Sequence, residues 1–194
     1  MKFTKVAADL FKKLQLNAGV LLHTFDPEAA EMDRGNIIGA TNGGVTFTAT
    51  PTFSDRGADI DNVPDNMMEL KELDNWSATM SGTYVTIDAN QVKSLLAAAD
   101  VEGDAITPRN DLDISDFEDV WWVGDYSDDN SEESGGMMAI HIINALSTGG
   151  FSVKSSDDGK GMFSFTYTAH YSLADPEKIP FEIFVRAGSA TENE

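Results

Sequence analysis

Carboxylates are the residues of this sequence most able to do chemistry. Residues 100–133 hold 13 Asp and Glu against one base, Arg109. The run Asp111–Ser115 spaces oxygen ligands as in the opening of an EF-hand calcium loop, but that loop also needs Gly at its sixth position and Glu at its twelfth. This sequence has Asp116 and Trp122 at those two positions. We therefore expect a solvated acidic loop system, with no bound metal and no other cofactor.

Other reactive groups are sparse. The three histidines, His23, His141 and His170, fall on separate predicted strands, and none has a second histidine at metal-ligand spacing. Cysteine is absent, and the sequence contains no nucleophile elbow, HExxH or P-loop motif. We expect no catalytic residues and no enzyme. A hydrolase that uses two unequal carboxylates is the alternative that so many acids leave open.

Two segments alternate as strands do. In Val45–Thr50, Val, Phe and Ala alternate with three Thr, and in Trp76–Ser81, Trp, Ala and Met alternate with Ser and Thr. Successive side chains of a strand point to opposite faces, so both segments are predicted to be half-buried strands. Between Ile37–Thr41 and the first of them, Asn42-Gly43 predicts a two-residue hairpin turn, because both residues tolerate positive φ.

The clearest helix is predicted over residues 88–100. Asp88 is its expected N-cap, and Gln91 is placed to complete a capping box. The apolar positions that follow recur at helical spacing and form one stripe. They are Val92, Leu95, Leu96 and Ala99. The stripe is expected to pack against the sheet, with packing between subunits as the alternative.

The chain is expected to be one domain, residues 1–194. Further strands are predicted at 19–25, at 137–146 and after Pro180, with a hairpin over 151–171. The predicted fold is mainly β, with two packed antiparallel sheets in a sandwich or barrel, one flanking α-helix, and long loop and terminal arms. These arms are an N-terminal arm at 1–18, a long loop at 53–75 and a flexible C-terminal tail at 189–194.

The charge of the chain restricts its partners. There are 33 Asp and Glu against 13 Lys and Arg, a formal net charge of −20. Nucleic-acid affinity comes largely from Lys and Arg on phosphates, so stable binding of nucleic acid or of an anionic membrane is not expected. No apolar run is long enough to cross a membrane, and the N-terminus lacks the features of a secretory signal. We expect the chain to be made in a cytosol.

Two features point to self-association. Trp121 and Trp122 are adjacent, so in a strand they face opposite sides of the sheet, and both sides need cover from the core or from a partner. The 23 residues 53–75 show no periodicity and are long enough to be an inter-subunit arm, with a mobile loop as the alternative. The candidate inter-subunit contacts are the apolar residues of these segments and of the helix: Phe53, Ile60, Val63, Met67, Met68, Leu70, Leu95, Leu96, Trp121 and Trp122.

Five runs of the sequence, in this order, resemble the major tail protein (tail tube protein) of long-tailed bacteriophages and prophages of Gram-positive bacteria. They extend over most of the chain, from about residue 14 to residue 188. The runs are IIGATNGGVTFTATPTFSDRGADIDNVPDN (37–66), NWSATMSGTYVTID (75–88), PRNDL with DFEDVWWVGDYSD (within 108–128), NALSTGGFSVKSSDDGKGMFSFTYTAHYS (144–172) and IPFEIFVRAG (179–188).

The resemblance implies a structural virion protein whose hexameric rings stack into a hollow tube that conducts the genome from capsid to host. Its implied partners are itself and the tape measure, tail terminator and distal tail proteins, with DNA only as passing cargo. Its implied location is the phage tail, assembled in the cytoplasm of the host bacterium. An acidic tube wall would repel DNA. The alternatives are the tube of a contractile or type VI-like injection machine, and a β-sandwich decoration or binding module.

Overall fold

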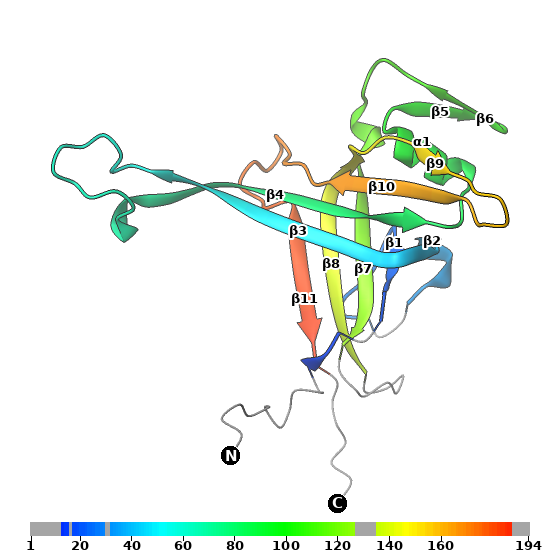
Figure 1. Cartoon of the computed structure of the whole chain (residues 1–194), viewed down its shortest axis with the longest axis horizontal. Helices are drawn as coiled ribbons and strands as arrows, with labels where there is room; N and C mark the ends of the chain where they lie inside the picture. Colours follow the sequence, from blue (N-terminus) through cyan, green and yellow to red (C-terminus); the bar gives the residue numbers. More distant parts are fainter. Residues whose placement is uncertain (1–12, 16, 30–31, 127–134, 188–194) are drawn as a thin grey trace, which may run out of the picture.

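Figure 1 shows the computed structural model of the chain, which describes residues 13–15, 17–29, 32–126 and 135–187. Within these residues the fold is mainly β, as expected, with eleven strands in antiparallel pairs and one α-helix. Most of the expected N-terminal arm, residues 1–12, and the expected tail at 189–194 lie outside the described residues.

The strands form two layers and a small separate hairpin. The first layer, the β7–β8 sheet, runs in the order β2 (Ile37–Gly39), β1 (Val20–Leu22), β7 (Glu118–Tyr126), β8 (Gly136–Ser147) and β11 (Phe181–Arg186). The second layer, the β3–β4 sheet, runs β3 (Thr41–Asp55), β4 (Lys71–Tyr84), β10 (Met162–Thr168) and β9 (Ser152–Lys154). The small hairpin is β5 (Ala99–Glu102) with β6 (Ala105–Pro108).

One strand joins the two layers. The end of β8, at Leu146 and Ser147, pairs with β10, whereas the rest of β8 pairs with β7 and β11. The layers therefore face each other as a sandwich whose sheets do not close into a barrel. In Figure 1, β10, β4 and β3 cross in front of β7 and β8.

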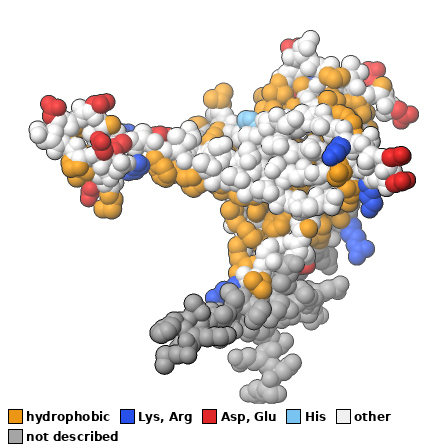
Figure 2. Space-filling model, in the orientation of Figure 1, with side chains coloured by type: hydrophobic (Ala, Val, Ile, Leu, Met, Phe, Trp, Pro, Cys, Tyr) orange, Lys and Arg blue, Asp and Glu red, His pale blue; other side chains and the backbone are white. Residues whose placement is uncertain are grey.

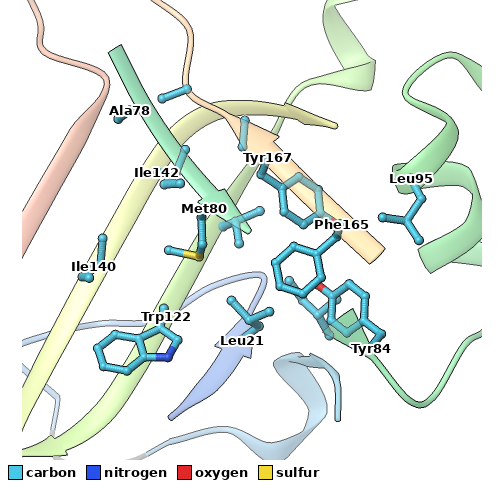
Figure 3. Close-up of a cluster of buried hydrophobic side chains, with 14 residues drawn as sticks. Leu21, Ala78, Met80, Tyr84, Leu95, Trp122, Ile140, Ile142, Phe165 and Tyr167 are labelled. Atoms are coloured by element: carbon cyan, nitrogen blue, oxygen red, sulfur yellow. The ribbon is translucent and has the colours of Figure 1, made fainter. Parts of the chain in front are cut away.

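The core lies between the layers. Figure 3 shows Met80 and Phe165 from the β3–β4 sheet facing Trp122 and Ile142 from the β7–β8 sheet. The alternation predicted for the two Thr- and Ser-rich strands is confirmed, because Val45, Phe47, Ala49, Ala78 and Met80 all pack in this core. The predicted hairpin over 151–171 is confirmed as β9 and β10, and the strand after Pro180 as β11.

The helix begins where the sequence places it but ends earlier. Helix α1 spans Ala89–Leu96, and Asp88 and Gln91 form both hydrogen bonds of the predicted capping box. The prediction that it continues to residue 100 is wrong. Ala97 has a φ of +64°, which ends the helix, and Ala99 begins β5 instead. The apolar stripe therefore spans two elements.

The hairpin predicted at Asn42-Gly43 is also wrong. β2 pairs with β1, and β3 pairs with β4, so the strands that flank Asn42 do not pair with each other. Gly43 and Gly44 do adopt positive φ, at +82° and +81°, but they lie inside β3 where its register with β4 shifts. The glycines form an irregularity within one long strand, because Thr41 before them pairs with Tyr84 and Val45 after them pairs with Gly82, both on β4.

Candidate interaction surfaces

A hairpin arm projects from the body. β3 and β4 continue beyond the core as far as Asp55 and from Lys71, and Figure 1 shows them extending away from the other strands. The prediction of an irregular loop over 53–75 is therefore wrong in its bounds, since the connecting segment is only 56–70. Periodicity is lost in the sequence because a register shift falls between Thr52 and Phe53, and because no second layer buries one face of the arm.

The tip of the arm has a defined backbone. The Asp55 carboxylate accepts hydrogen bonds from the backbone N–H groups of Asn66 (2.8 Å) and Gly57 (2.9 Å), which hold the pKa of that carboxyl below its usual range. The N–H of Arg56 donates to the carbonyl oxygen of Leu70 at 2.9 Å, and its guanidinium pairs with Glu72. Each of these contacts closes the connecting segment on itself, so the arm ends in a compact unit.

Apolar side chains on the arm remain open to solvent. Val63 and Leu70 are partly buried against Gly57, but five other large apolar side chains of the arm are exposed. Their exposed fractions are 53% for Phe53, 51% for Ile60, 38% for Met67, 81% for Met68 and 47% for Leu73. Large exposed apolar side chains gathered on one segment mark an interaction surface. Of the arm residues predicted from the sequence to make contacts, Phe53, Ile60, Met67 and Met68 are thus exposed.

Unlike the apolar side chains of the arm, the adjacent Trp121 and Trp122 are buried. They face opposite sides of the β7–β8 sheet, as predicted, with Trp122 in the core and Trp121 in a second cluster on the outer face. Their exposed fractions are 8% and 7%, and Trp121 stacks on His141 with 3.9 Å between ring centroids. The cover that both faces need is supplied by this chain itself. A role of either residue in an interface stays a prediction.

The helix residues are also mostly covered. Leu95 is fully buried in the core, and Leu96 is partly buried. Packing against the chain's own sheets, the first expectation for the apolar stripe, accounts for Leu95.

The outer edge of the β3–β4 sheet is open. β3 pairs with β4 on one side, and no described strand pairs with its other side. The Ala78 carbonyl of β4 accepts a hydrogen bond from the Ala169 N–H (3.0 Å), on the β10 side. The Val85 N–H, just after β4, donates to the Ala40 carbonyl (2.8 Å), on the β3 side. The backbone groups of even-numbered β4 residues therefore face β10, and those of odd-numbered residues face β3. Because neighbours on a strand alternate in this way, the direction of each backbone group on β3 follows.

Alternate N–H groups of β3 point to the open side. Thr48 lies opposite Thr79, an odd-numbered residue of β4, so the even-numbered residues of β3 bond to β4. The backbone groups of Val45, Phe47 and Ala49 therefore face the free edge. Pro51 continues this series, and a proline is tolerated in a strand where its missing N–H would have faced an edge.

The outer face of the same sheet is uncharged. Between the arm and the opposite end of the sheet, the outward positions of β3, β4 and β10 are all hydroxyl residues. They are Thr46, Thr48, Thr50, Ser77, Thr79, Ser81, Thr83, Ser164, Thr166 and Thr168. Figure 2 views this face as a largely white area, whereas red carboxylates gather at the tip of the arm and at the far end of the body. We call these ten positions the hydroxyl face.

The acidic residues and histidines in the described part of the chain do not gather into a metal site. No group of three or more His, Asp and Glu among the described residues has the geometry to hold a metal ion. Asp113 caps the short turn at Ile114–Asp116, and the backbone hydrogen bond from Ser115 lowers the pKa of its carboxyl. His170 packs edge-on to Phe117. None of the helices described here is both long and apolar enough to cross a membrane.

One polar network was not foreseen from the sequence. Glu118, at the start of β7, lies 3.5 Å from His23 and accepts a hydrogen bond from Ser94 of α1, and the Ser94 hydroxyl lies 3.0 Å from that of Tyr167. Burial raises the pKa of Tyr167 to about 12. The Glu118 carboxylate contacts both His23 and Ser94, so it links the segment that follows β1 to β7 and to α1. Only the tertiary structure brings residues so distant in sequence together.

Comparisons with known proteins show a remote likeness to a solved structure. No known protein family matches the sequence, and no curated protein matches it. Among solved structures, a chain of the "Virion of native gene transfer agent (GTA) particle" is similar over 88% of this chain and 96% of its own length, with a TM-score of 0.43 and 11% sequence identity. Neither value is high enough to transfer a function.

Proposed function

We propose that this chain is a structural subunit of a phage tail tube, in which rings of it, six to a ring, stack into a conduit for the genome. The observation that carries the proposal is the open edge of β3. An exposed edge strand of this length, with no charged residue from Val45 to Ser54, invites pairing with another chain. Pairing with further copies removes that edge.

The two ends of the β3–β4 sheet differ, which favours a ring. One end is β3, and the other is formed by β9 and the last residues of β8. A contact between unlike edges is head-to-tail, and such contacts close into rings or continue as filaments, whereas a contact between like edges stops at a dimer. A continuous sheet made in this way would line a channel with the hydroxyl face.

The arm suits the second contact that a tube needs. It extends beyond the body, and its exposed Ile60 and Met68, in the segment that connects β3 to β4, offer apolar surface beyond the end of the β3 edge. We propose that it contacts the next ring. The tape measure, tail terminator and distal tail proteins are the further partners, DNA is cargo, the location is the virion, and the chain has no catalytic role.

The edge is tested with Ala49→Pro. The substitution removes an N–H that faces the open side and none that bonds to β4, so the domain should fold while ring formation is lost. Ala49→Ser keeps the N–H and is the matched control. Electron microscopy and light scattering at rising concentration measure assembly, and circular dichroism measures folding. Rings or tubes from the folded proline variant, or a control that also fails to assemble, would overturn the role of this edge.

The arm is tested by deleting Asp59–Met68. Because the connecting segment closes on itself and contributes nothing to the core, the deletion should leave a folded domain that does not polymerise. Microscopy of the deletion should show single rings or monomers. Normal tubes would show that the arm is dispensable. A wild-type protein that stays monomeric at high concentration and with other tail proteins added would contradict the tube itself, and would favour a binding module.

A further inference from the structure

An apolar groove lies between the two layers beside the open edge of β3. It has a volume of about 330 Å³. Its described lining residues include none from β4 or β10, so the groove opens on the free side of β3, and none of them is charged. The large apolar side chains that line it come from both layers. They are Val45, Phe47, Trp122, Met138 and Ile140.

The apolar surface of the groove continues onto β11. Val185 lies directly opposite Met138, and Ile183 lies directly opposite Ile140, so all four side chains point to the core-facing side of the β7–β8 sheet. Ile183 is 47% exposed and Val185 is 56% exposed. Described residues therefore leave a row of core-facing apolar side chains uncovered here, and such a surface marks a contact with another molecule.

The opposite edge of the β3–β4 sheet carries exposed apolar side chains on the same face. Figure 1 shows β3, β4, β10 and β9 in this order across the sheet, so β9 is at the far edge. Val153 of β9 lies opposite Phe163, which packs against the core, and it is 54% exposed. Phe151, just before β9, is 40% exposed, and its ring centroid lies 6.1 Å from that of Phe163. Ser152, between them, lies opposite Ser164 of the hydroxyl face.

Both edges are free of charge in a strongly acidic chain. Residues 37–54, which include most of β3, contain no Asp, Glu, Lys or Arg, and neither do residues 144–153, which run from β8 into β9. Two copies that each carry a net charge of −20 repel each other. A contact between these two edges brings no like charges together, so it is the approach that costs least.

We propose that Phe151 and Val153 of one copy fill the groove beside β3 of the next copy, against Val45, Phe47 and Met138. The inference rests on the proposed function, because a sheet that continues through the ring brings β9 of one copy beside β3 of the next. If the hydroxyl face stays on one side of that sheet, Val153 points to the same side as Val45 and Phe47. Backbone hydrogen bonds then give affinity, and the groove selects which edge is accepted.

A photocrosslinker tests which residues meet. Benzoylphenylalanine replaces Phe151, so that an aromatic residue takes the place of an aromatic residue. The full-length variant is assembled with isotope-labelled wild type, irradiated and digested, and mass spectrometry identifies the crosslinked peptides. We expect peptides that join residue 151 of a variant chain to residues 44–49 or 137–142 of a labelled chain. The same crosslinker at Ser152 is the matched control, and these peptides should be lost because Ser152 points to the hydroxyl face.

A charge placed in the contact tests its contribution to assembly. Val153→Asp should raise the protein concentration needed for ring formation by about tenfold or more, because an unpaired carboxylate loses its hydration in an apolar groove. Since Val153 is exposed in the single chain, circular dichroism should show an unchanged fold. Ser152→Asp adds the same charge on the opposite face of the strand, and its effect on that concentration should be much smaller.

The results separate this contact from the tube itself. Electron microscopy of the same samples shows whether rings form. Rings in which the crosslinker at residue 151 misses the groove would overturn the contact and leave the tube standing, and so would equal effects of Val153→Asp and Ser152→Asp. A wild-type protein that forms no rings under any condition would overturn both.

Discussion

The outer faces of the two sheets are treated in opposite ways. On the β7–β8 sheet the outer face carries an apolar cluster that the chain buries with its own residues. Trp121 packs edge-on against Phe25 and stacks on Phe184 and His141. On the β3–β4 sheet the outer face is the hydroxyl face, and described residues leave both this face and the β3 edge uncovered. The outer face of the β7–β8 sheet is buried within the subunit, whereas the outer face of the β3–β4 sheet is available for contact with another molecule.

The difference shows where to expect function. An apolar face must be buried for the domain to be stable, so its residues are constrained by folding. Folding of the core does not require Ser or Thr on an exposed face. In a chain with a net charge of −20, ten outward positions without a single Asp or Glu are therefore notable. An uncharged surface of this extent therefore suits contact with a polyanion that has to pass without binding. This replaces the expectation of an acidic, repelling wall with a proposal of a neutral one.

The largest effect should separate the two faces by stability. Trp121→Ala removes a buried ring from the covered face and should lower the free energy of unfolding by about 3–5 kcal/mol. Thr48→Ala, on the exposed hydroxyl face, should change it by no more than about 0.5 kcal/mol. Urea unfolding of the monomer measures both. A Trp121 variant as stable as the Thr48 variant would mean that the outer cluster is not part of the fold.

The next effect concerns DNA. The wild-type protein, assembled or not, should have no measurable affinity for double-stranded DNA at physiological salt. Ser77→Lys with Thr79→Lys should create measurable binding that falls steeply as salt rises, because each lysine added to the hydroxyl face can pair with a phosphate. Thr107→Lys with Asn110→Lys adds the same charge on the β5–β6 side and is the control. Fluorescence titration with DNA at two salt concentrations measures the affinity of each variant. Micromolar binding by the wild type would contradict the prediction that this surface does not bind DNA.

The smallest effect tests how the cover of the β7–β8 sheet is anchored. His23 starts the segment that carries Phe25, and its hydrogen bond with Glu118 raises the pKa of its imidazole above the usual 6.5. Because the folded-state pKa is the higher one, this contribution is complete below pH 6.5 and is lost as the pH rises through the folded-state pKa.

Since the pair is half-exposed, the melting temperature of the wild type should fall by only about 1 °C relative to His23→Gln between pH 6 and pH 8. Differential scanning calorimetry at the two pH values measures this difference. A difference that grows with pH would have the wrong sign and would assign the pKa shift to another cause.

The sequence predicts an element correctly where residues close together in the chain determine it. The alternation of Val45–Thr50 and Trp76–Ser81 identified both strands and their buried faces, and the capping box at Asp88 identified the start of the helix. The Asn42-Gly43 hairpin failed because turn preference describes two residues, whereas pairing depends on which strand offers a matching face. The sequence predicts a loop for the arm because strands without a buried face have no hydrophobic periodicity.

The sequence by itself determined the mainly-β class, the positions of most strands, the absence of cysteine chemistry and the excess of acid, because each depends on residue type and local spacing. Only the tertiary structure decided that Trp121 is covered within the chain, that β3 presents alternate N–H groups to an open edge, and that ten hydroxyl side chains from three strands share one face. These properties depend on strand order and register. They arise from contacts between residues far apart in the chain, where no local pattern records the partner.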